Sequence, residues 1–124
     1  MISNIEPIEV IKNTMLDHIE VFISQNGEFY PFGILLSHKG ETRSITVIDN
    51  DIKQAILDNK GKIEELVCKN YKYHSGGYCV DTIVNGISKI QMNLISQTSK
   101  GWIRFYLSYI FKDGRINYGE FEME

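Results

Sequence analysis

The sequence predicts an α+β domain in which an antiparallel sheet of about six strands carries two helical segments on one face. Three observations lead to this fold class. Apolar residues recur at helical spacing over residues 4–25, apolar and polar residues alternate in several later segments, and dipeptides that favour tight turns separate those segments. The expected order is one helix, two strands, a second helix and four strands. Because 124 residues suffice for one hydrophobic core, we expect a single domain over residues 1–124.

The first helix is expected over residues 4–25. Pro7 lies in its first turn, where a missing N–H costs little, and Gly27 favours the helix end. Lys12 falls on the apolar side, where its stem would cover apolar surface while its amine reaches water. The opposite side of the helix is polar and mostly acidic, with Glu6, Glu9, Asn13, Asp17 and Glu20.

A hairpin and a second helix should follow. Residues 28–36 and 43–48 are the expected hairpin strands, and Pro31 restricts the first strand to an edge of the sheet or to a position at the strand's own beginning. The Asp-Asn-Asp sequence at residues 49–51 predicts a helix start. The Lys-Gly-Lys sequence at residues 60–62 should interrupt this helix, giving two short helices or one kinked helix.

The last third of the chain is expected to consist of strands joined by short turns. Residues 74–77 should form a loop before the first of these strands. An Asn-Gly and an Asp-Gly dipeptide predict tight hairpin turns. Residues 102–111 include apolar side chains at every odd position from 103, so we expect the centre of the sheet there. In the final strand the apolar positions change parity at Gly119, which predicts a β-bulge.

Composition excludes several classes of function. The net charge of −3 and the pI of about 5.6 argue against nucleic-acid binding, because phosphate-binding surfaces are usually basic. No apolar run approaches the ~20 residues of a membrane span, so we expect no membrane partner. The N-terminal residues lack a basic segment followed by an apolar one, so a cytoplasmic location is expected.

Motifs for catalysis, cofactors and metals are missing from the sequence. Neither a P-loop nor a dinucleotide-binding glycine pattern occurs. Cys68, His74 and Cys79 lack the close spacing of zinc ligands, and reduced thiols are expected in the cytoplasm. His18 and His38 are equally far from any ligand-like pattern. We therefore expect no enzyme, no metal and no cofactor.

The acidic and aromatic residues have two interpretations. As ordinary structure, the carboxylates solvate a helix face, cap a helix or protect an edge strand, and the aromatic rings pack across strands. As a functional surface, they would bind a basic protein, because complementary charge speeds encounter and aromatic side chains anchor interfaces. The candidate partner-binding residues are Asp49, Asp51, Glu120, Glu122, Glu9, Asp17, Glu20 and Tyr73.

Several short motifs are distributed along the chain. They are E-F-Y-P-F-G at residues 28–33, Gly40, Tyr109, Asp113-Gly114 and Tyr118-Gly119-Glu120. These motifs resemble those of small bacterial single-domain proteins over nearly the whole chain, although Ser108-Tyr109 stands where those proteins commonly carry Pro-Tyr. Acidic α+β domains of this kind are similar in class to immunity proteins of polymorphic or contact-dependent growth inhibition systems.

The resemblance implies an immunity protein that binds and neutralises a cognate bacterial toxin, a nuclease being one candidate. Such a protein would be a monomer or a weak homodimer. An alternative is a small-ligand-binding or enzymatic α+β domain with a pocket between sheet and helix, lined by Asp81, Tyr78, Trp102 and Tyr106. A third hypothesis is a structural homodimer formed through an exposed sheet face.

Overall fold

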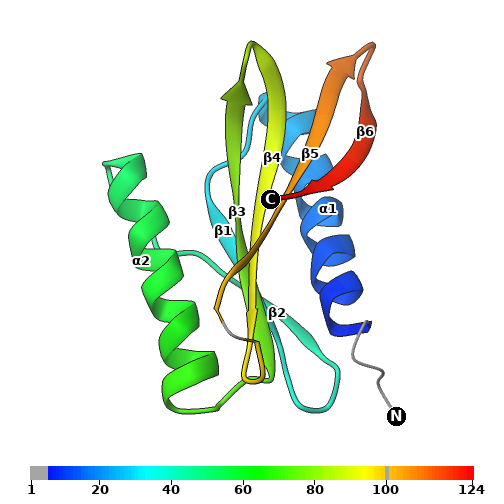
Figure 1. Cartoon of the computed structure of the whole chain (residues 1–124). Helices are drawn as coiled ribbons and strands as arrows, with labels where there is room; N and C mark the ends of the chain where they lie inside the picture. Colours follow the sequence, from blue (N-terminus) through cyan, green and yellow to red (C-terminus); the bar gives the residue numbers. More distant parts are fainter. Residues whose placement is uncertain (1–5, 100) are drawn as a thin grey trace.

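The computed structural model describes residues 6–99 and 101–124, and it confirms the α+β class (Figure 1). Six antiparallel strands form one sheet in the order β2-β1-β3-β4-β5-β6. The first two residues of the expected first helix, 4 and 5, lie outside the described residues. The elements are α1 (Glu6–Asn26), β1 (Phe32–Leu36), β2 (Thr42–Ile45), α2 (Ile52–Glu64), a π-helical turn η1 (Glu65–Lys69), β3 (Ser75–Val84), β4 (Ile87–Ser96), β5 (Ile103–Lys112) and β6 (Arg115–Met123).

The two helices lie on opposite faces of the sheet, so the expectation that both pack on one face is wrong. Ile34 belongs to the core under α1, whereas Leu35, the next residue in β1, belongs to the core under α2. Adjacent strand residues point to opposite faces, and all five residues of β1 are buried. A continuous apolar run of this kind is typical of a strand covered on both sides. The α1 core also contains Ile11, Met15, Ile19, Ile23, Cys79, Ile90, Met92 and Leu107.

The predicted division into two short helices at residues 60–62 is also wrong, because α2 continues through Gly61 as far as Glu64. A glycine inside a helix costs about 1 kcal/mol. Burial of Ile63 and Val67 against the sheet outweighs this cost, since each large apolar side chain contributes about 1.5–3 kcal/mol. The predicted start of the helix is confirmed: the Asp51 side chain accepts a hydrogen bond from the Lys53 backbone N–H.

The expected loop at residues 74–77 is largely strand, because β3 begins at Ser75. Gly76 lies under Ile63 of α2, and Gly77 lies under Met15 of α1. A Cβ on Gly77 would be 2.7 Å from the carbonyl oxygen of Asn93 and 2.9 Å from the Met15 side chain. These glycines allow close packing from both sides, and they are not turn residues.

The hairpins at the end of the chain follow the sequence closely. Asn85-Gly86 and Asp113-Gly114 all have positive φ, as tight hairpin turns require. The bulge is confirmed, because the pairing of β5 with β6 shifts register between Leu107 and Tyr109. However, β3 and β4 form the centre of the sheet, and β5 is one strand from the edge.

Two further expectations concern single residues. Pro31 directly precedes β1, which is flanked by β2 and β3, so the strand-beginning alternative holds and the edge alternative does not. The Lys12 amine does not extend into water. It lies 4.0 Å from the ring centre of Phe121 and 4.6 Å from that of Phe105, and the side chain is only 9% exposed.

Candidate functional site

One half of the sheet is left uncovered on its α2 side. Helix α2 packs on β1 and β3, and it lies away from β5 and β6 (Figure 1). The side chains of β4, β5 and β6 that point to the α2 side therefore form a mostly polar surface, which we name the open face. It consists of Ile87, Lys89, Gln91, Asn93, Arg104, Tyr106, Ser108, Ile110, Lys112, Arg115, Asn117, Glu120, Glu122 and, directly after β6, Glu124.

Hydrogen bonds link the centre of the open face into one network. The Arg104 Nε donates to Asn93 Oδ1 at 2.6 Å, and Asn93 Nδ2 donates to Gln91 Oε1 at 2.9 Å. The Gln91 amide in turn donates to the Tyr106 hydroxyl at 3.3 Å. Asn93 is only 1% exposed, so the residue that joins Arg104 to Gln91 in this network is itself buried. A partner that binds here meets side chains that are already ordered, which lowers the entropic cost of association.

Two ion pairs and one pair of aromatic rings border the centre of the open face. Glu122 pairs with Lys89 at 3.4 Å, and Glu124 with Arg104 at 3.7 Å. On the side nearest α2, the Trp102 ring packs edge-on against Tyr78 with 5.1 Å between ring centres, and the Trp102 Nε1–H donates to Glu64 at 2.7 Å.

The structure does not bring the predicted partner-binding residues together. Glu120 and Glu122 lie on the open face, whereas Glu9, Asp17 and Glu20 lie along α1, on the other side of the sheet. These two acidic groups therefore cannot form one patch.

The remaining predicted residues have local structural roles. Asp51 caps α2, and Asp49 accepts a hydrogen bond from the Asp51 backbone N–H at 2.9 Å. The Tyr73 hydroxyl accepts from Arg43 at 3.3 Å, and the Tyr73 ring is half-buried against the α2 core. Within the described residues, the cap interpretation of the Asp-Asn-Asp sequence is thus confirmed.

The four residues expected to line a pocket are divided between the two faces. Asp81 lies on the α1 side, where it accepts a hydrogen bond from the Tyr109 hydroxyl at 2.7 Å, while Tyr78, Trp102 and Tyr106 lie on the α2 side. Burial raises the pKa of Asp81 above its ordinary value, although the hydrogen bond from Tyr109 opposes this shift. The predicted cavity between these four residues does not exist.

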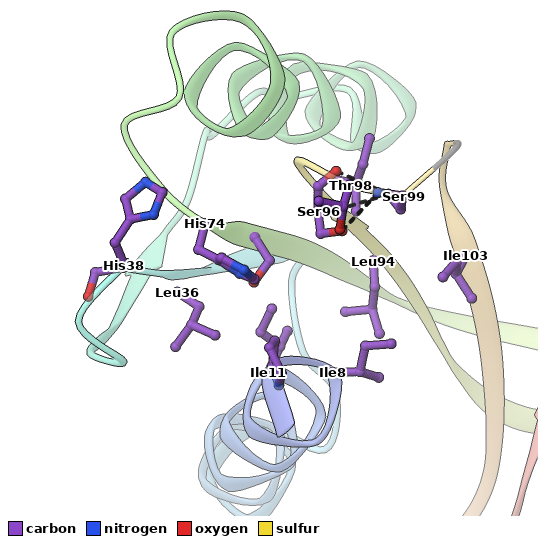
Figure 2. Close-up of a pocket in the computed structure, with 14 residues that line it drawn as sticks. Ile8, Ile11, Leu36, His38, His74, Leu94, Ser96, Thr98, Ser99 and Ile103 are labelled. Atoms are coloured by element: carbon purple, nitrogen blue, oxygen red, sulfur yellow. Dashed lines mark hydrogen bonds between the residues drawn. The ribbon is translucent and has the colours of Figure 1, made fainter. Parts of the chain in front are cut away.

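A pocket is instead found at the start of α1, with a volume of about 530 Å³ (Figure 2). Its polar rim includes His38 and His74, whose ring centres are 6.0 Å apart. The pairing of Leu36 with Ser75 between β1 and β3 brings these two histidines together. No local signal in the sequence indicated that pairing, so the spacing of the histidines gave no hint of a shared site.

The cysteines are separated by the sheet. Cys79 is fully buried in the α1 core, and Cys68 packs against the α2 core, so no disulfide joins them in this arrangement. Burial raises the pKa of the Cys79 thiol well above its ordinary value, which disfavours the nucleophilic thiolate. Residues 6–99 and 101–124 contain no group of three or more histidine, cysteine or carboxylate side chains placed to hold a metal ion.

In the same described ranges, no helix is both long enough and apolar enough to cross a lipid bilayer. Comparison of the chain with protein-family models, with curated proteins and with solved structures gives no match.

Proposed function

We propose that this chain is a protein-binding inhibitor, an immunity protein that neutralises a cognate bacterial toxin through its open face. The observation that carries the proposal is the uncovered half of the sheet, where a hydrogen-bonded polar network is already ordered. A standard protein interface buries about 800 Å² on each partner. Three strands of nine or ten residues offer a surface of that order.

The acidic end of the open face selects a basic partner. At this end Glu120, Glu122 and Glu124 outnumber the two cations Lys89 and Arg104, whereas Lys112 and Arg115 lie at the other end, beside the β5–β6 hairpin turn. A toxin that acts on nucleic acid must itself be basic, because it binds phosphates. Carboxylates that take the place of those phosphates would speed association and orient the inhibitor, while Tyr106 and Trp102 supply aromatic anchors.

The same proposal places the protein in the cytoplasm as a monomer or a weak homodimer without catalytic activity. Two ionisable groups that burial removes from solvent serve structure: the half-buried Asp81 is hydrogen-bonded to Tyr109, and the Cys79 thiol is fully buried. A homodimer formed through the open face would compete with toxin binding. Light scattering at rising protein concentration measures whether such a homodimer forms.

The test is protection of cells together with direct binding. The native chain is co-expressed with the toxin encoded next to it, and the complex is isolated through a tag on the chain. We expect survival and a stoichiometric complex. The double variant Glu120→Lys and Glu122→Lys should weaken binding about tenfold or more and abolish protection.

A matched control separates the open face from general charge effects. The double variant Asp17→Lys and Glu41→Lys makes the same change in net charge at exposed positions outside the open face. It should protect cells as well as the native chain does. Failure of the native chain to bind or protect against any neighbouring gene product, or equal losses in both double variants, would overturn the proposal.

The pocket at the start of α1 favours a second candidate function, the binding of a small molecule. Its described lining contains no carboxylate, and Asp81, which burial shifts toward its neutral form, lies elsewhere. The binding part of this alternative therefore has structural support, whereas the enzymatic part has none among the described residues.

A further inference from the structure

The pocket at the start of α1 has the size of a small-molecule site. Sites of this kind measure about 300–1,000 Å³, and this pocket measures about 530 Å³. It lies where the hydrophobic layer between α1 and the sheet ends, so its interior continues the core. Figure 2 shows the view along α1 into this end of the layer.

The floor of the pocket is apolar. Ile11, Leu36 and Leu94 form its deep part, and each of them is at most 2% exposed. Ile8 and Ile103 are half-buried and form its walls. A hydrocarbon group that replaced water on this surface would gain about 25 cal/mol for each Å² of apolar area covered.

The rim of the pocket consists of neutral or basic hydrogen-bonding groups. Two imidazoles and five hydroxyl groups are present, and the described lining contains neither a carboxylate nor an amine. The hydroxyl groups belong to Ser37, Ser75, Ser96, Thr98 and Ser99. A cationic ligand would find no counter-charge on this rim, and an anionic ligand would find no repulsion.

His74 is the donor best placed for a ligand. Its ring lies near the middle of the pocket in Figure 2, and His38 lies at the outer edge. The His74 Nδ1 is 3.2 Å from the Ser75 hydroxyl, which can donate to it, and the imidazole then carries its proton on Nε2. No described residue forms a hydrogen bond with Nε2. The His38 Nε2, in contrast, already donates to the Tyr71 carbonyl oxygen at 3.2 Å.

From these features we infer that the pocket binds a small amphipathic carboxylate. Its hydrocarbon part covers the floor formed by Ile11, Leu36 and Leu94, and its carboxylate accepts a hydrogen bond from His74. A charge-assisted bond of this kind is about twice as strong as a neutral one. The site lies on the α1 side of the sheet and is separate from the open face.

The test compares three probes that have an unbranched ten-carbon chain and differ in the head group: decanoate, decanol and decyltrimethylammonium. Each is titrated into the native chain below its micelle concentration, and amide chemical shifts are followed by NMR. We expect saturable shifts around Ile8, His74 and Ile103 with decanoate. Decanol should bind about tenfold more weakly, and the cation more weakly still.

Two variants locate the site. His74→Phe keeps the ring but removes the donor, and it should reduce decanoate affinity about tenfold while leaving decanol affinity unchanged. Ile8→Trp fills the pocket from its half-buried wall and should abolish binding of both probes. Ile52→Trp adds the same ring at an exposed position on α2 and should bind like the native chain.

Four results would overturn the inference: no saturable binding of decanoate, equal affinity for all three probes, shifts that map away from the pocket, or an unchanged decanoate affinity in His74→Phe. None of these results bears on toxin binding by the open face. Conversely, loss of protection in the open-face variants leaves decanoate binding as it was, so the two proposals fail separately.

Discussion

Met15 of α1 lies directly over Gly77 of β3, so closely that a Cβ on Gly77 would be 2.9 Å from the Met15 methyl carbon. The same Cβ would be 2.7 Å from the carbonyl oxygen of Asn93, which belongs to the rigid ladder between β3 and β4. The helix can shift, but the ladder cannot. The contact therefore fixes how closely α1 approaches the centre of the sheet.

The first prediction follows from this contact. Gly77→Ala should lower the free energy of unfolding by about 1–3 kcal/mol, because the added methyl group overpacks the core and pushes on backbone. Urea denaturation followed by circular dichroism measures the change. Adding Met15→Ala to this variant should recover none of the loss, because the clash with the Asn93 carbonyl remains; full recovery would contradict the prediction.

The second prediction concerns Gly61, where α2 continues in spite of a glycine. A Cβ at this position has no neighbour within 4 Å, and φ is not positive. Gly61→Ala should therefore raise the free energy of unfolding by about 0.4–1 kcal/mol, through the lower entropy of the unfolded chain and better helix propensity. Urea denaturation again provides the measurement. A destabilised Gly61→Ala variant would show that the glycine is needed for a bend.

The difference between these two glycines explains what the sequence could and could not predict. Helix and strand periods are local, so the elements and the bulge at Gly119 were predictable from the sequence. Whether Gly61 breaks a helix, or Gly77 lies in a loop or a strand, depends on what packs on it. Met15 lies 62 positions from Gly77, and no pattern near either residue indicates their contact.

The same reasoning applies to the candidate site. The alternation of apolar and polar residues over β4 indicates a strand with one wet side, but it does not indicate that α2 packs on β1 and β3 and leaves β4 open. The residues that the sequence analysis missed are Asn93, Arg104 and His74. Their roles depend on strand pairing: Asn93 opposes Arg104 in the register of β4 and β5. Asn93 occupies one of the odd, polar positions of an alternating strand, so nothing in the sequence distinguished it from its more exposed neighbours.

The third prediction concerns the Lys12 amine and the Phe121 ring, which are 4.0 Å apart. A cation over a ring contributes about 0.5–2 kcal/mol, and more when both are shielded from water. A double-mutant cycle of Lys12→Met and Phe121→Leu should therefore give a coupling energy in this range. Both single variants keep the apolar bulk, so the cycle isolates the interaction.

The pair of Lys60 and Trp102 provides the matched control for that cycle. Its amine lies 5.9 Å from the ring centre, near the limit of such interactions. A cycle of Lys60→Met and Trp102→Leu should give a smaller coupling energy than the first cycle. Equal coupling in both cycles would mean that the distance between amine and ring does not control the interaction.

The last prediction concerns alkaline pH and Tyr118. Burial raises the pKa of Tyr118 above its ordinary value of 10.0, and the charge of Glu20, which accepts the tyrosine hydroxyl hydrogen bond at 3.1 Å, raises it further. The folded state therefore keeps a proton that the unfolded state loses. The stability contributed by this group is complete below pH 10 and is lost as the pH rises from there through the folded pKa.

Tyr118→Phe removes this dependence. At about pH 8 the variant should be less stable than the native chain by about 1 kcal/mol, because the hydrogen bond to Glu20 is lost. At about pH 11 the difference should shrink or reverse, since only the native chain has the phenol to ionise on unfolding. Glu20→Gln removes the charge but not the burial, so the pKa of Tyr118 should fall only part of the way toward 10.0. Urea denaturation at both pH values, with phenolate absorbance for the titration, checks both variants, and a difference that grows with pH contradicts the assignment.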